Sequence, residues 1–101
     1  MFEIHTTAKY KKQRKKLSQD DRDLLDSVIY TLASGENLEP KHRDHKLTGE
    51  LKGFRECHIK PDLLLIYAKN RNALILTCVE VGSHSELFKG CLLYTSPSPR
   101  D

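Results

Sequence analysis

The chain has 101 residues, of which 31% are charged and 38% hydrophobic, and its formal net charge is +3. This length allows one domain with one modest hydrophobic core. No segment approaches the roughly 20 consecutive apolar residues of a membrane span, and the lysine-rich N-terminal region lacks the apolar centre of a signal peptide. We therefore expect a soluble, cytoplasmic protein without a membrane partner. The cysteines Cys57, Cys78 and Cys91 show no paired C-x-x-C spacing, which predicts free thiols.

Residues 2–6 alternate apolar and polar side chains, which predicts a strand, and Thr6 or Thr7 can cap a helix that runs to about Lys16. This helix is basic, with positive charges at Lys9, Lys11, Lys12, Arg14, Lys15 and Lys16. A second helix is predicted from Ser18 to Gly35, because apolar residues recur there at spacings of three and four. The charged residues of this segment are mostly acidic, so we expect one basic and one acidic side of the molecule.

The second half of the chain predicts a sheet. Residues 38–49 have the composition of a loop, which carries His42 and His45. Three strand-like runs follow over residues 53–60, 63–69 and 73–81, and their short connections favour antiparallel pairing. Residues 82–88 predict a turn into a short helix with His84 in its first turn. This order of elements predicts an α+β fold in which a strand and two helices pack on a mainly antiparallel sheet.

The C-terminal residues have a different composition from the rest. The string CLLYTSPSPRD holds two prolines and resembles the translated read-through of a sequencing adapter. We therefore assign residues 1–89 to one domain and expect residues 90–101 to be a disordered, non-native tail.

Four titratable side chains stand out among the predicted strands and loops, namely His45, His58, Asp62 and His84. Imidazoles can both accept and donate protons near neutral pH, which suits cleavage of RNA through its own 2′-hydroxyl without a metal. A metal site is disfavoured because His42 and His45 lie in an irregular loop and no thiolate joins them.

Two stretches, DHKLTGELKGFRECHIKPDLLLIY at residues 44–67 and VGSHSELF at residues 81–88, resemble the YafQ branch of the RelE/ParE toxin superfamily. The resemblance covers residues 2–89 and implies a RelE-like fold. It also implies a toxin of a type II toxin-antitoxin system that acts as a ribosome-dependent mRNA endoribonuclease, an mRNA interferase. The implied partners are the ribosome, mRNA and a cognate antitoxin through which the complex binds operator DNA.

The resemblance assigns functional roles to His45, His58, His84, Asp62 and Phe88. His84 is the candidate general acid, while His58 and His45 share the role of base. Asp62 either orients an imidazole or caps the turn that its Pro-Asp sequence predicts. Phe88 either stacks on an mRNA base or packs the last helix on the sheet. The basic residues of the first helix fit ribosomal RNA, with a solvated helix face as the alternative.

One position departs from the pattern of the family, because Glu80 stands where an arginine is expected. A carboxylate there opposes stabilisation of a phosphorane. Arg55 and Lys60 are candidate replacements for the missing cation at the substrate. Strand alternation places Arg55 on the face opposite His58 and gives Lys60 the same parity as His58. Glu80 also keeps open an alternative function, a non-catalytic toxin such as a gyrase inhibitor or an inactive antitoxin-binding homologue.

Overall fold

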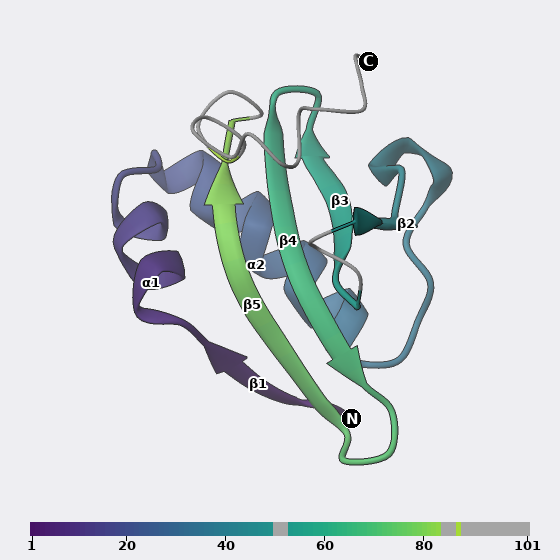
Figure 1. Ribbon diagram of the computed structural model, residues 1–101. Helices are drawn as coiled ribbons and strands as arrows, with labels where there is room; N and C mark the ends of the chain where they lie inside the picture. The colour runs from purple at the N-terminus through teal and green to yellow at the C-terminus, as the bar shows by residue number, and fades with distance from the viewer. Residues whose placement is uncertain (50–52, 84–86, 88–101) are drawn as a thin grey trace.

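The computed structural model describes residues 1–49, 53–83 and 87. Along the chain, β1 (Glu3–Thr6) is followed by α1 (Ala8–Lys15) and α2 (Gln19–Ala33). A 3₁₀ helix, η1 (Pro40–His42), and β2 (His45–Lys46) come next. The chain continues with β3 (Arg55–Lys60), β4 (Leu63–Asn70) and β5 (Ile75–Gly82). This arrangement confirms the predicted α+β fold (Figure 1).

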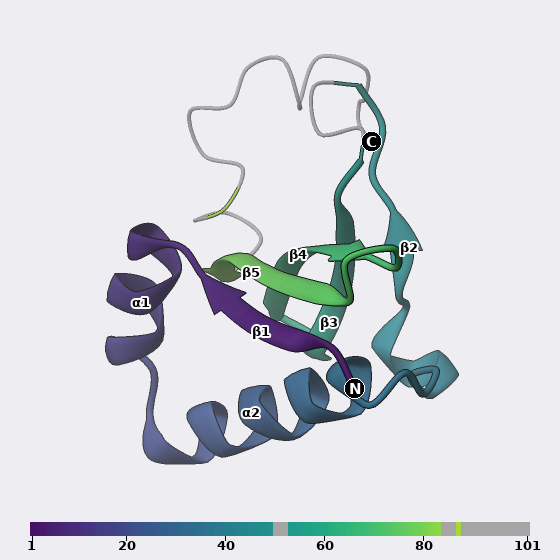
Figure 2. The same cartoon turned by 90° about the horizontal axis from the view of Figure 1, so that it is seen from below.

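The strands form one five-stranded sheet in the order β1-β5-β4-β3-β2. The β2–β3, β3–β4 and β4–β5 pairs are antiparallel, as the short connections predicted, whereas β1 runs parallel to β5. Figures 1 and 2 show α2 across one face of the sheet and α1 beside β1 and β5. We call the face covered by α2 the helix face and the opposite one, which carries Glu56 and His58, the outer face.

Local capping sets the starts of both helices. Thr7, rather than Thr6, caps α1 by accepting a hydrogen bond from the Tyr10 backbone N–H at 3.0 Å. Ser18 caps α2 in the same way, with the Asp21 N–H at 3.2 Å. The chain leaves α2 through Gly35, whose φ of +89° suits glycine because it has no Cβ. These observations confirm both predicted helices, with ends that differ by one or two residues.

The core lies mainly between α2 and the helix face. Apolar residues of α2 pack there against Cys57, Leu65, Tyr67, Cys78 and other buried strand residues. A smaller cluster on the outer face contains Leu47, Leu64, Ile66 and Leu87, with Phe54 and Val79 packed against it. Strand β4 is therefore buried on both faces, as its continuous apolar sequence predicted.

Residues 38–49 are more regular than predicted, because β2 pairs with β3 and places His45 opposite Glu56. A strand of two residues is too short to show alternation, so β2 could not be predicted from the residue pattern. His45 thus lies on an edge strand of the sheet. None of the helices in residues 1–49, 53–83 and 87 has the length and apolar composition of a membrane span.

Two predicted features lie wholly or largely outside the described residues. Within the predicted C-terminal helix, the Leu87 N–H donates to the Ser83 carbonyl oxygen at 2.9 Å. His84, Phe88 and the tail of residues 90–101 are not described. The roles of His84 and Phe88 and the domain boundary at residue 89 therefore stay predictions.

Candidate acid–base site

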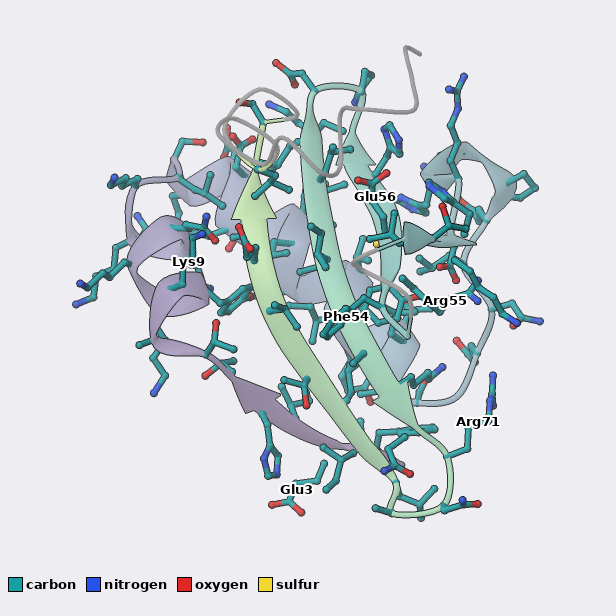
Figure 3. All side chains as sticks on the ribbon, in the orientation of Figure 1. Glu3, Lys9, Phe54, Arg55, Glu56 and Arg71 are labelled. Atoms are coloured by element: carbon teal, nitrogen blue, oxygen red, sulfur yellow. The ribbon has the colours of Figure 1, made fainter. Side chains whose placement is uncertain are left out.

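A row of side chains crosses four strands of the outer face. In the register of the sheet, Glu56 of β3 lies opposite His45 of β2 and opposite Ile66 of β4. Ile66 in turn lies opposite Glu80 of β5. His58 lies two residues along β3 from Glu56, so the two side chains share a face. The strand register therefore places two imidazoles and two carboxylates on one face, with Glu80 two strands away from Glu56. Figure 3 shows Glu56 beside β2 and β3.

Glu56 is the buried charged group of this row, with only 4% of its surface exposed. Its Oε1 lies 3.3 Å from His45 Nε2, while its buried Oε2 has no hydrogen-bond partner among the described residues. A buried carboxylate is costly unless it is paired or hydrogen-bonded. This oxygen can therefore accept a hydrogen bond from a ligand, and Glu80 Oε1 is a second buried carboxylate oxygen of the outer face without a hydrogen-bond partner among the described residues.

The orientation of His45 follows from its other nitrogen. His45 Nδ1 lies 2.6 Å from the Arg43 carbonyl oxygen, which can only accept, so Nδ1 carries a proton. Nε2 then faces Glu56, and the two groups can share one proton between them. A fixed tautomer beside a carboxylate is the arrangement that a general acid or base needs.

His58 is half-buried and lies opposite Leu64 in the next row of the sheet. Its carbonyl oxygen accepts a hydrogen bond from His42 Nδ1 at 2.7 Å, which ties η1 to β3. His42 therefore has a structural role, and its backbone partner leaves the His58 imidazole on the outer face.

Asp62 lies in the exposed turn between β3 and β4. It makes no hydrogen bond or ion pair with another described residue, so the structure does not bring it into contact with His45 or His58. Its charge acts instead on Lys60, whose pKa is raised first by the hydrogen bond with Asp21 and to a smaller extent by Asp62. This placement fits the turn role that the Pro-Asp sequence also predicted.

The two candidate substrate cations lie on the helix face. Arg55 is opposite in direction to His58, as predicted, and its Nε lies 3.1 Å from Asp44 Oδ1. The prediction for Lys60 is wrong, because the β3–β4 register shifts between His58 and Lys60. This bulge turns Lys60 toward α2, where its Nζ lies 2.9 Å from Asp21 Oδ1.

The partly buried network around Arg55 has a structural role. Tyr67 donates its hydroxyl proton to Asp44 at 2.5 Å, and Arg55 Nε lies 3.3 Å from the same hydroxyl. Burial lowers the pKa of Arg55, but the hydrogen bonds with Asp44 and Tyr67 outweigh it and raise the pKa overall. The pKa of Tyr67 is also raised, first by burial and then by its hydrogen bond with Asp44.

The basic residues of α1 divide into paired and solvated groups. Arg14 is paired with Asp26 at 2.6 Å, and this contact raises the pKa of Arg14. Lys9 lies 3.3 Å from Glu80 Oε1. The rest of the predicted patch is exposed, namely Lys11, Lys12, Lys15 and Lys16.

Sequence reasoning missed Glu56, although one signal could have found it. Glu56 lies in the run of residues 53–60 that predicted a strand, two residues before His58, so strict alternation places both side chains on one face. A groove of about 800 Å³ lies elsewhere, lined by Asp44, Lys46, Arg55, Lys69 and Arg71 among others, and none of the histidines that the structure describes lines it. No group of three or more His, Cys, Asp or Glu side chains in the described part of the chain is placed to hold a metal ion.

Comparison with known proteins decides the family. Residues 2–89 match the family model for the bacterial toxin YafQ of type II toxin-antitoxin systems. The chain belongs to the YafQ toxin family. The mRNA interferase toxin YafQ of Escherichia coli K12 is 37% identical over 51 residues, which are 50% of this chain and 53% of that protein. The chain spans about half the length of the curated relatives it matches.

Solved structures extend this likeness over most of the chain. A metal-bound toxin from Helicobacter pylori is 48% identical, with a TM-score of 0.79, and the match covers 87% of this chain and 100% of that one. The E. coli DinJ–YafQ toxin-antitoxin complex contains a chain that is 28% identical, with a TM-score of 0.74. That match covers 86% of this chain and 97% of the other. The fold of this protein is therefore that of the YafQ toxins.

Proposed function

We propose that this protein is the toxin of a type II toxin-antitoxin system and cuts mRNA on the ribosome as an endoribonuclease. Membership of the YafQ family and the name of the E. coli relative support the class of activity. The observation that carries the proposal is the outer-face group in which buried Glu56, with its unsatisfied Oε2, meets His45 beside His58. A group of this kind can take the proton of a ribose 2′-hydroxyl.

The proposed reaction is an internal transesterification. The proton of the 2′-hydroxyl passes to the group formed by Glu56, His45 and His58, and the 2′-oxygen then attacks phosphorus. The bond from phosphorus to the 5′-oxygen breaks, and the leaving oxygen receives a proton from His84, which follows β5 in the chain. The products are a 2′,3′-cyclic phosphate and a free 5′-hydroxyl. Imidazoles and a carboxylate supply both proton transfers, so the proposed chemistry needs no metal.

The proposed partners follow from charge and from the relatives. The exposed lysines of α1 suit the phosphates of ribosomal RNA, which a basic patch can bind without reading sequence. E. coli YafQ forms a complex with DinJ, and we assign this chain a cognate antitoxin on that basis. Binding of operator DNA would occur through the antitoxin, and with these proposed partners we assign the toxin to the cytoplasm.

The test uses a purified translation system that contains ribosomes, a defined message and the full-length protein. We expect cuts within translated codons, with 2′,3′-cyclic phosphate ends, and undiminished cutting when EDTA is added at a level that leaves ribosomal Mg²⁺ in excess. His84→Ala should lower the rate by about 100-fold or more, as loss of a general acid does. The matched control is His5→Ala, because the His5 side chain is exposed and its imidazole pairs with exposed Glu3 at 3.2 Å, on β1.

Three outcomes would contradict the proposal. Wild-type protein that leaves the message intact would remove the nuclease function, and growth arrest without cutting would favour the non-catalytic toxin instead. Equal rates for His84→Ala and His5→Ala would remove His84 from the mechanism. Loss of cutting on selective removal of a transition metal, with recovery on its return, would contradict the metal-free reaction.

A further inference from the structure

We propose that Lys9 binds an RNA phosphate next to the scissile one and that Glu80 holds its ammonium group at the site. This inference rests on the proposed nuclease function and adds one contact to it. Lys9 then acts on the substrate, while Glu80 is a positioning residue. The proposal follows from a bulge in β5 and from the hydrogen bonds that fix α1 to this strand.

A bulge in β5 turns Glu80 toward the outer face. Tyr67 lies opposite Cys78 and Ile66 lies opposite Glu80, so Val79 is an extra residue between the two pairs. Cys78 packs in the core of the helix face, whereas Val79 packs against the outer cluster. Without the bulge, strict alternation would send Glu80 to the same side as Cys78. Bulges often re-aim a side chain in this way beside a functional site.

Helix α1 is fixed to β5 on both sides of this bulge. Pairing of β1 with β5 ends at Cys78. Beyond that point, side chains of the α1 N-cap and of α1 form hydrogen bonds with backbone groups of β5. Thr7 Oγ1 donates to the Val79 carbonyl oxygen at 2.7 Å, and the Val81 N–H donates to Gln13 Oε1 at 2.8 Å. Lys9 lies between these two anchors, so its position over β5 is set by the fold. Figure 3 shows Lys9 on α1 at the β5 side of the sheet.

The contact between Lys9 and Glu80 leaves the ammonium group available. Lys9 Nζ lies 3.3 Å from Glu80 Oε1, but this buried oxygen has no aligned hydrogen bond from a described residue. The Lys9 side chain is 67% exposed, against 22% for Glu80. An ammonium group has three donors, so it can face the carboxylate and still donate to a phosphate oxygen. The first turn of α1 holds no acidic residue, and its N-terminus adds positive potential at the same place.

Four other basic side chains of the sheet lie on the helix face. Arg55 and Lys60 are held by Asp44 and Asp21 on the helix face. Lys46 pairs in register with Arg55, and Lys69 with buried Leu76, which places both on that face too. Among the lysines of residues 53–83 and α1, Lys9 is the one that forms an ion pair with a carboxylate of the row of Glu56, Ile66 and Glu80. Glu56 and Glu80 are separated by two strand spacings, roughly 10 Å, which a dinucleotide can bridge.

The experiment compares Lys9→Met with Lys41→Met in single-turnover cleavage on ribosomes that carry a defined message. Lys41 is a matched control because it also forms an exposed pair, with Glu39 at 3.4 Å, on η1. At saturating toxin, Lys9→Met should lower the cleavage rate about tenfold or more, since it removes a charge-assisted contact and leaves Glu80 unpaired. Lys41→Met should cleave at the wild-type rate. In a Glu80→Gln background, Lys9→Met should lower the rate by no more than about threefold.

Several results would overturn the proposal. If Lys9→Met raises only the toxin concentration needed for half-saturation, Lys9 anchors the ribosome and does not bind at the site. An equal loss with and without Glu80 would remove the positioning role of that carboxylate. If wild-type protein cuts nothing, the proposed function fails, and binding of a fluorescent 2′-O-methyl RNA tetranucleotide still tests this inference. Weaker RNA binding by Lys9→Met than by Lys41→Met supports the inference, and equal RNA binding by these two variants overturns it.

Discussion

The two faces of the sheet treat their polar groups differently. On the helix face, Arg55, Asp44 and Tyr67 satisfy one another, and Lys60 is paired with Asp21. On the outer face, Glu56 is more deeply buried than any of these carboxylates, yet one of its oxygens has no partner among the described residues. Buried polar atoms are normally satisfied in folded proteins, so an exception needs a reason. This contrast fits the proposed site on the outer face, although Arg22 Nε of α2 is also buried without a hydrogen-bond partner among the described residues.

The largest predicted effect on stability comes from neighbouring residues of β4 that point to opposite faces. Leu65 is fully buried against the large core, whereas Ile66 is 2% exposed in the smaller outer cluster. Leu65→Ala should lower the free energy of unfolding by about 3 kcal/mol or more, and Ile66→Ala by about 2 kcal/mol. Urea unfolding followed by circular dichroism measures both. A greater cost for Ile66→Ala would show that the outer face carries the fold.

The next prediction compares the changes in stability when two carboxylates, one on each face, are neutralised. Asp44→Asn should cost about 1–2 kcal/mol of stability, because it weakens the acceptor shared by Arg55 and Tyr67. Glu56→Gln should leave stability unchanged or raise it, since it removes a buried charge with an unsatisfied oxygen. The same variant should lose most RNA cleavage. The comparison fails if Glu56→Gln unfolds the protein more readily than Asp44→Asn does.

These two cases also show what the sequence could and could not predict. Periodicity predicted α2 and strands β3 to β5, because each has enough residues to display its repeat. It could not predict that Glu56 meets His45, since this depends on pairing between strands that are distant in the chain. It misplaced Lys60 because a bulge reverses alternation without changing the residue pattern. The parallel pairing of β1 with β5 is likewise a long-range feature.

The last prediction is alkaline destabilisation from the thiols of the helix face. Burial raises the pKa of the Cys78 thiol from its ordinary 9.0 to about 12, and burial also raises that of Cys57. The thiols of the unfolded chain ionise first, at about their ordinary pKa. Their contribution to the free energy of unfolding should therefore be constant below pH 9 and should fall as the pH rises from 9 toward 12. The slope is about 1.4 kcal/mol per pH unit for each thiol.

The measurement is the free energy of unfolding in urea at pH 8 and at pH 10. Cys78→Ala serves as the control, because it removes one thiol from the titration and should make the fall between the two pH values smaller. An unchanged stability of the wild type between pH 8 and pH 10 would contradict the burial of both thiols.

The most direct test of the central claim maps where RNA binds. Titration of ¹⁵N-labelled protein with a 2′-O-methyl RNA tetranucleotide, which carries phosphates but no free 2′-hydroxyl, reports the contact surface through amide shifts. We expect the largest amide shifts at Glu56, His58 and Glu80 on the outer face. Changes confined to Lys46, Lys69 and Arg71, which line the groove of about 800 Å³, would contradict it.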